Sequence, residues 1–428
     1  MAEASAKPKV SVLRLFTSRR MFMVVLSGFS SGLPLSLTAS TMQAWMKDSG
    51  VDLTTIGAFA LVGIPYSLKF LWAPVLDRYT LPFLGRRRGW ILVTQIFLAA
   101  AIAAMGLVDP KEHLGLLALL ALCVAFGSAS QDVVIDAWRT ETLTVDEYGA
   151  GAAAQTIGYR GAMLVSGAVA LALADTLPWR TVYLMMAGVM TLSIAYTLFA
   201  AEPKVAARPP RTLTEAAVFP LVEFLKRKGS IENLAFIILY KLDVVMALAL
   251  TTPFLQELGF TKTVIAGVNK GGGLAAVILG TVAGGALLPK LGMKKALWAF
   301  GVLQGIATLS FLALSIVGKN YALMVFAICA DNFFSGMGTA AYAAFLMSLC
   351  NPKFTATQFA LLSSLMALTR TVAGAPTGWL AEHLGWPTYF VVCTLAMIPG
   401  LLLLTRFDRW KGPELEPVVQ EEPGQAGR

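Results

Sequence analysis

Residues 114–139 read LGLLALLALCVAFGSASQDVVIDAWR. The first half of this stretch is apolar and uncharged, as in a helix that crosses the roughly 30 Å hydrocarbon core of a bilayer. The second half carries Gln131, Asp132, Asp136 and Arg139. Charged side chains inside a spanning helix normally face a partner or a water-filled path. The stretch therefore predicts a spanning helix with a polar face near one end.

The whole chain has the composition of an integral membrane protein. Of its 428 residues, 57% are hydrophobic and 14% are charged, and the mean hydropathy is +0.69. Soluble proteins carry about 25% charged residues. The net charge of +9 lies in short loops between apolar segments, which favours the bilayer over nucleic acid as a partner. The four cysteines and two histidines lack ligand spacing, so no metal or other cofactor is expected.

Apolar runs predict twelve spanning helices. They lie near residues 20–46, 52–76, 89–108, 114–138, 148–174, 180–201, 232–256, 262–288, 295–317, 321–349, 355–380 and 386–405. Alternate loops are rich in Lys and Arg, and the positive-inside rule assigns that set of loops to the cytoplasm. Both termini are then cytoplasmic, which agrees with an even number of spans.

A long polar segment divides the helices into two groups of six. We expect a six-helix bundle in residues 1–201, a cytoplasmic linker in 202–231, a second six-helix bundle in 232–405 and a cytoplasmic tail in 406–428. A weak internal repeat supports this division, because residues 84–88 match 291–295 and residues 174–181 match 381–388 at one offset. This all-α plan resembles the major facilitator superfamily, whose substrate site lies between the halves.

Three segments carry a more specific resemblance. They are SGFSSGLPLSLTASTMQAWM (27–46), TTIGAFALVGIPYSLKFLWAPVLDRYTLPFLGRRRGW (54–90) and GSASQDVVIDAWR (127–139). Together they resemble the AmpG-type muropeptide permeases of the major facilitator superfamily, which also resemble acetyl-coenzyme A transporters. The resemblance implies a multi-pass permease of the bacterial inner membrane, not an enzyme. It implies import of anhydromuropeptides from periplasm to cytoplasm by proton symport and alternating access, and we expect a monomer.

Charged residues deep in the predicted spans are the candidate site residues. Arg160 and Arg370 fall near the midplane of the fifth and eleventh helices, and a guanidinium group suits a carboxylate of an anionic glycopeptide. The predicted substrate-binding residues are Gln131, Asp132, Tyr159, Arg160, Lys241, Asn332 and Arg370. Asp132 either faces the central cavity or pairs with Arg160. For Asp132 a static buried ion pair is the alternative, and for Tyr159 it is ordinary packing.

Proton coupling needs a carboxylate that titrates in a changing environment. The predicted proton-coupling residues, in order of preference, are Asp331, Asp132 and Asp243. Lys241 and Asp243 are two residues apart and point to different sides of a helix, so we do not expect them to pair.

The loop between the second and third helices resembles the signature loop of the superfamily in loosened form. A carboxylate there bonds an arginine or a helix end while the cytoplasmic side is shut, and the region of Arg139 is a candidate partner. The predicted gating residues are Asp77, Arg78, Arg86, Arg87, Arg88, Asp136 and Arg139. Asp136 and Arg139 are also expected to pair locally as a latch. The alternative is that the three arginines only fix topology.

Two segments are predicted to be weak points. Residues 28–34 contain two glycines and a proline and should bend mid-membrane and line the cavity, and the glycines at 271–273 interrupt the eighth helix.

A membrane-embedded enzyme is disfavoured, because the sequence has no nucleophile motif. The alternative within transporters is another anionic solute, such as a siderophore or acetyl-coenzyme A.

Overall fold

The computed structural model describes residues 17–204, 209–374 and 376–410, without the side chains of Leu53, Leu368, Arg370 and Thr371. Within these residues the regular secondary structure is entirely helical. Eleven helical segments are long and apolar enough to cross a membrane. The helix α19 (Thr355–Gly374) is not among the eleven, because its Thr, Ser, Gln and Arg residues lower its hydropathy. The predicted eleventh span is therefore the least apolar of the twelve.

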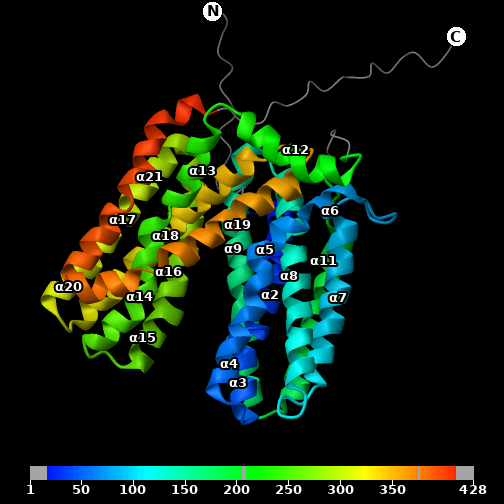
Figure 1. Cartoon of the computed structure of the whole chain (residues 1–428), viewed down its shortest axis with the longest axis horizontal. Helices are drawn as coiled ribbons and strands as arrows, with labels where there is room; N and C mark the ends of the chain where they lie inside the picture. Colours follow the sequence, from blue (N-terminus) through cyan, green and yellow to red (C-terminus); the bar gives the residue numbers. More distant parts are fainter. Residues whose placement is uncertain (1–16, 205–208, 375, 411–428) are drawn as a thin grey trace, which may run out of the picture.

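The N-terminal half holds the helices up to α11. Its elements are α2 (Arg19–Leu37), α3 (Ser40–Asp48), α4 (Leu53–Ala58), η1 (Phe59–Gly63), α5 (Ile64–Leu68), η2 (Lys69–Leu71), α6 (Ala73–Arg78), α7 (Arg88–Gly106), α8 (Leu114–Thr142), η3 (Val145–Glu147), α9 (Tyr148–Met163), the π-helix η4 (Leu164–Val169), α10 (Ala170–Ala174) and α11 (Trp179–Phe199). Helix α12 (Leu213–Lys226) belongs to the segment between the halves and crosses one end of the molecule (Figure 1).

The C-terminal half repeats this plan. Its elements besides α19 are α13 (Ser230–Leu239), α14 (Leu242–Glu257), α15 (Lys262–Val268), the π-helix η5 (Asn269–Gly273), α16 (Leu274–Leu291), α17 (Met293–Val317), α18 (Tyr321–Leu349), α20 (Thr377–Leu395), α21 (Ile398–Leu403) and η6 (Leu404–Arg409). Gly85 and Gly292, which the repeat equates, both have positive φ and precede the equivalent helices α7 and α17.

Several predicted spans are interrupted, which corrects their expected continuity. The second span is a chain of short α- and 3₁₀-helices, and the seventh breaks between α13 and α14. The described part of α19 ends at Gly374, next to residue 375, which lies outside the described residues. The non-helical backbone of Gly385, where φ is 72°, falls between the predicted eleventh and twelfth spans and agrees with their boundary. The glycines at 271–273 lie in a π-helix, so that predicted weak point is confirmed. Tertiary packing compensates for the lost helical bonds at these sites.

The first span bends later than predicted. Helix α2 runs unbroken through residues 28–34, and the break comes at Ala39. Gly28 and Gly32 are buried against α9 rather than lining an open path, and a Cβ there would lie 2.4 Å from Gln155 O and 2.5 Å from Tyr159 O. The glycines therefore serve close helix packing, the role that small residues have between membrane helices.

Gly158 of α9 tests the close packing between α9 and α2 most sharply. A Cβ on Gly158 would lie 1.9 Å from Val25 O, whereas Gly161 on the same helix has nothing within 4 Å. We expect Gly158→Ala to destabilise the protein by at least about 2 kcal/mol, since a backbone atom blocks the new methyl group. Gly161→Ala is the matched control and should leave the thermal midpoint in detergent unchanged or higher. Equal midpoints for the two variants would contradict this packing.

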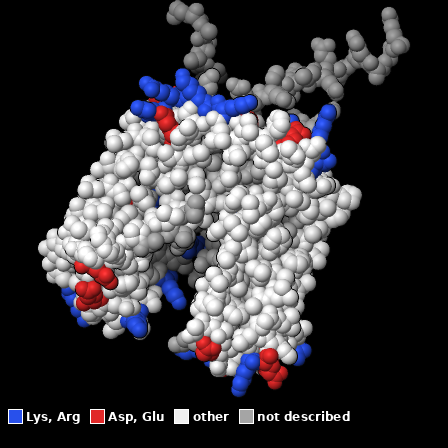
Figure 2. All heavy atoms as spheres, viewed as in Figure 1, with Lys and Arg blue, Asp and Glu red and all other residues white. Residues whose placement is uncertain are grey.

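The two halves meet at one end of the molecule and diverge at the other (Figure 1). They join where the described chain begins and ends, and we call this the termini end. Contacts between the halves include α9 with α16 and α19 with both α6 and α8. Figure 2 shows a hollow between the halves that opens at the opposite end, with basic side chains in its walls. The fold thus closes one side of a central path and leaves the other open.

Candidate functional site: a clamp and two buried charge groups

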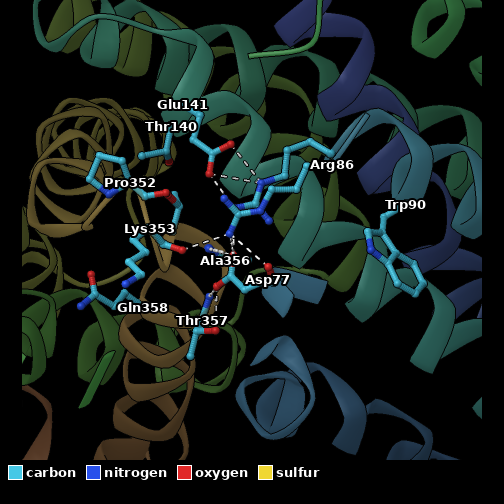
Figure 3. Close-up of polar contacts among 12 residues, drawn as sticks. Asp77, Arg86, Trp90, Thr140, Glu141, Pro352, Lys353, Ala356, Thr357 and Gln358 are labelled. Carbon is cyan, nitrogen blue, oxygen red and sulfur yellow. Dashed lines mark hydrogen bonds and ion pairs between the residues drawn. The ribbon is translucent and has the colours of Figure 1, made fainter. Parts of the chain in front are cut away.

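Asp77 joins the two halves at the termini end (Figure 3). It is the one acidic residue of α6, and its side chain is fully buried. Thr357 donates to Asp77 Oδ2 through both its backbone N and its Oγ1, each at 2.7 Å. These donors belong to the first turn of α19, where free N–H groups and the helix dipole favour a carboxylate. Asp77 therefore caps a helix of the opposite half.

Two arginines surround the same carboxylate. Arg87 Nη2 lies 2.8 Å from Asp77 Oδ1 and 2.5 Å from Glu141 Oε1 at the end of α8. Arg86 Nη2 lies 3.1 Å from Asp77 Oδ1 and donates to the Lys353 carbonyl of the other half at 3.0 Å. Burial alone would lower the pKa of Arg87, but the Glu141 and Asp77 carboxylates outweigh burial and raise this pKa above its ordinary value. We call these residues, with the first turn of α19, the clamp.

The other predicted gating residues lie beside the clamp. Arg88 donates to Thr197 O at 2.9 Å and to Leu198 O at 2.7 Å, so it caps α11 within the N-terminal half. The Arg78 guanidinium lies 5.3 Å from the centre of the Tyr79 ring. A gating role for either residue stays a prediction, and the contacts favour Arg86 and Arg87.

The region of Arg139 contacts the loop, as expected, but through Glu141 and not through Arg139 itself. Arg139 Nη2 donates to Asp136 Oδ1 at 2.9 Å, so the predicted local pair is confirmed. The Arg139 guanidinium also lies 5.7 Å from the Phe359 ring centre on α19. The loop reaches α8 instead through Arg87 and Glu141. The spacing of Asp136 and Arg139 satisfies their charges locally, which leaves Glu141 for the loop.

A second charge group lies deeper in the N-terminal half. Asp132 is half-buried on α8 and accepts a hydrogen bond from Ser31 Oγ of α2. Lys69 Nζ, which is buried, lies 3.9 Å from Asp136 Oδ2 and also acts electrostatically on Asp132. Among the described ion pairs none joins Asp132 to Arg160. The structure therefore does not show the expected Asp132–Arg160 pair, and the described neighbours of Asp132 include Ser31, which donates to it, and Lys69, which acts on it electrostatically.

Arg160 is a cation in the middle of the fifth span that forms no ion pair within the described structure. It is half-buried, and its guanidinium lies 4.0 Å from Met163 Sδ. Arg160 and Asp132 both act electrostatically on the half-buried Tyr159. Gln131 differs, because it is fully buried and its Nε2 donates to Ser30 Oγ at 2.5 Å. Of the predicted binding residues in this half, Asp132, Tyr159 and Arg160 are half-buried and Gln131 is buried, and a binding role for each stays a prediction.

A third charge group lies inside the C-terminal half. Lys241 occupies the break between α13 and α14, and its Nζ donates to Gln304 Oε1 at 2.8 Å. Gln304 Nε2 lies 2.8 Å from both carboxylate oxygens of Asp243. Lys241 and Asp243 form no ion pair among the described residues, as expected. The helix break nevertheless lets both reach Gln304 of α17, which the sequence did not predict.

The remaining predicted residues of the C-terminal half surround this group. Asp331 on α18 is 1% exposed, and Asn332 is half-buried beside η5 with its Nδ2 donating to Ile328 O at 2.8 Å. Arg370 lies on α19, and its side chain is outside the described residues. Lys270 in η5 is exposed and adds a basic side chain in the first third of the span Lys262–Leu291.

Sequence reasoning missed three residues that organise these groups. Ser31, Glu141 and Gln304 are polar residues in helices that otherwise read as apolar, and that contrast was the available signal. Among the described residues there is no group of three His, Cys, Asp or Glu side chains that could hold a metal ion.

Comparison with known proteins agrees with this geometry. The sequence profile of the Major Facilitator Superfamily matches residues 24–374. The anhydromuropeptide permease of Escherichia coli (strain K12) is 48% identical over 92% of this chain and 80% of its own length. The chain belongs to the AmpG-type permeases of the major facilitator superfamily. It is a multi-pass transporter of the bacterial inner membrane, not an enzyme.

More distant AmpG-type relatives and solved structures extend the comparison. A Rickettsia felis relative named transporter AmpG 4 is 31% identical over 93% of this chain and 99% of its own length. The proton:xylose symporter XylE shares the fold with a TM-score of 0.70 and 11% identity, covering 94% of this chain and 97% of its own. FucP in an outward conformation has a TM-score of 0.69 and 12% identity, covering 92% and 99%. At these identities the solved structures show the superfamily fold alone.

Proposed function

We propose that this AmpG-type permease imports anhydromuropeptides from the periplasm to the cytoplasm as a monomer, driven by protons. The proposal rests mainly on the 48% identity to the E. coli anhydromuropeptide permease across nearly the whole chain. Two basic residues within the spans, Arg160 near the middle of its span and Lys270 in the first third of its span, supply counter-charges for peptide carboxylates. Tyr159 beside Arg160 offers an aromatic surface on which a sugar ring can pack.

The conformation is outward-facing if the termini end lies in the cytoplasm. Lys and Arg gather at that end beside the chain ends (Figure 2), which supports this orientation by the positive-inside rule. The hollow then opens to the periplasm, and the clamp closes the cytoplasmic side. Substrate binding in the hollow draws the outer ends of the halves together, and the clamp separates to release substrate inward.

The linker between the halves supports the same assignment of the gate. Lys353 Nζ lies 2.9 Å from Glu215 Oε1 of α12, and Gln358 Nε2 donates to Glu223 Oε2 at 2.7 Å. The hydrogen bond from Lys353 holds the pKa of the Glu215 carboxyl below its usual range. Helix α12 therefore binds the same end of α19 that Asp77 caps, and we infer that it moves with the C-terminal half when the clamp opens.

Binding of purified protein to defined ligands tests the substrate. Isothermal titration in detergent would compare an anhydromuropeptide, the same sugar without its peptide, acetyl-coenzyme A and a ferric siderophore. We expect the anhydromuropeptide to bind most tightly and the peptide-free sugar to lose at least about tenfold in affinity, because it lacks the carboxylates that basic residues recognise. Tighter binding of acetyl-coenzyme A or the siderophore would reject the muropeptide and select that solute instead.

A further inference from the structure

The buried charge group of the C-terminal half is unbalanced. Among the residues whose side chains the structure describes, it contains one cation, Lys241, and two carboxylates, Asp243 and Asp331, all at most 8% exposed. An unpaired charge in this environment is costly, because the surroundings solvate it poorly. Burial and charge count together point to a missing positive charge.

Gln304 distinguishes the two carboxylates, because its side chain bonds Asp243 and not Asp331. Its carbonyl accepts from Lys241 Nζ while its amide donates to both oxygens of Asp243, so one side chain links these two charges as a pair. Lys241 Nζ also donates to Ser335 O at 3.1 Å. The amide donor of Gln304 is engaged with Asp243, and no hydrogen bond of the described structure links Gln304 to Asp331.

Asp331 has no such partners. Neither of its carboxylate oxygens accepts a hydrogen bond within the described structure. It is the only charged residue of α18. The groups acting on it are Lys241 and Asp243 from the α13–α14 side and the Thr308 hydroxyl of α17. The Cys393 thiol of α20 is a weaker neighbour.

The N-terminal half shows that this imbalance is specific to one half. Its deep group contains two cations, Lys69 and Arg139, and two carboxylates, Asp132 and Asp136. Each carboxylate has a hydrogen-bond donor, Ser31 for Asp132 and Arg139 for Asp136. This group is therefore balanced without an added proton, whereas the described side chains around Asp331 hold one carboxylate more than cations.

We propose that Asp331 carries the coupling proton and that Gln304 is the positioning residue that keeps Lys241 away from it in the outward-facing state. A proton from the periplasm binds a carboxylate oxygen of Asp331 and makes the group neutral. The Ser335 carbonyl that holds Lys241 lies one helical turn from Asp331, so a shift of about one turn brings Lys241 to Asp331. Lys241 then replaces the proton, which leaves to water on the cytoplasmic side.

This inference rests on the proposed function, and Asp331→Asn tests it. The amide mimics the protonated acid, so we expect the variant to exchange labelled anhydromuropeptide across proteoliposomes at a rate within about threefold of wild type. It should lose accumulation driven by an inward proton gradient. Asp175→Asn neutralises an exposed carboxylate and should keep accumulation. Accumulation by Asp331→Asn would overturn the proposal, and so would loss of both activities in a folded variant that still binds substrate.

A substrate-free measurement separates this inference from the identity of the substrate. Spin labels on the two sides of the clamp report its opening by double electron–electron resonance. We expect the distance distribution of wild type to shift between pH 5 and pH 8, and that of Asp331→Asn to stay fixed. A pH shift retained in Asp331→Asn but lost in Asp132→Asn would move the proton to the N-terminal half and overturn the proposal, whatever the substrate is.

Discussion

Replacing Asp77 by Asn is expected to reduce uptake at least tenfold. The variant keeps the shape of the side chain but removes the charge that two arginines and the first turn of α19 share. Breaking a buried ion pair by removing one partner costs about 3–5 kcal/mol, and each 1.4 kcal/mol is a factor of about ten in an equilibrium. Because these contacts join the halves, the substitution lowers the stability of the state in which the clamp is closed.

The measurement combines transport with the geometry of the clamp. Spin labels across the termini end should show a longer mean distance in Asp77→Asn than in wild type. Asp146→Asn is the control, because Asp146 is an exposed acidic residue in η3, just beyond the end of α8. If Asp77→Asn transports at the wild-type rate with an unchanged distance distribution, the clamp does not control the gate.

Arg160→Ala is expected to lower the affinity for anhydromuropeptide by about a hundredfold and to abolish uptake at micromolar substrate. A charge-assisted contact to a carboxylate in a partly desolvated site is worth about 2–3 kcal/mol. Arg160 lies mid-span and forms no ion pair in the described structure, so its charge is free to bind substrate. Removing it should leave folding intact, since no buried partner loses its counter-charge.

Two variants separate charge from geometry at this position. Arg160→Lys keeps the charge but loses the planar fork, so we expect affinity between those of wild type and Arg160→Ala. Arg180→Ala removes an exposed arginine at the start of α11 and should bind normally. Wild-type affinity in Arg160→Ala would remove Arg160 from the substrate site and leave the family assignment untouched.

Local interactions were predictable from the sequence, and distant ones were not. Hydropathy located the spanning segments, and a spacing of three residues predicted the pair Asp136–Arg139. The partner of Asp77 is Thr357, which lies 280 residues away, so only the docking of the two halves reveals it. Gln304 likewise lies 63 residues from Lys241, with which it shares a hydrogen bond.

Helix breaks account for the remaining differences. Glycine and proline in residues 28–34 predicted a bend, but α2 packs closely against α9 there and stays helical. The break at Lys241 carries no glycine or proline, so nothing in the sequence indicated that Lys241 and Asp243 share Gln304. Packing between helices thus decided which potential breaks formed.

Uptake by purified protein in proteoliposomes tests the whole account most directly. Labelled anhydromuropeptide would be supplied outside with an inward proton gradient, and a protonophore would be added midway. The account predicts accumulation above the external concentration and release after the protonophore. Uptake that only equilibrates, with the protonophore having no effect, would contradict proton-driven import by this permease.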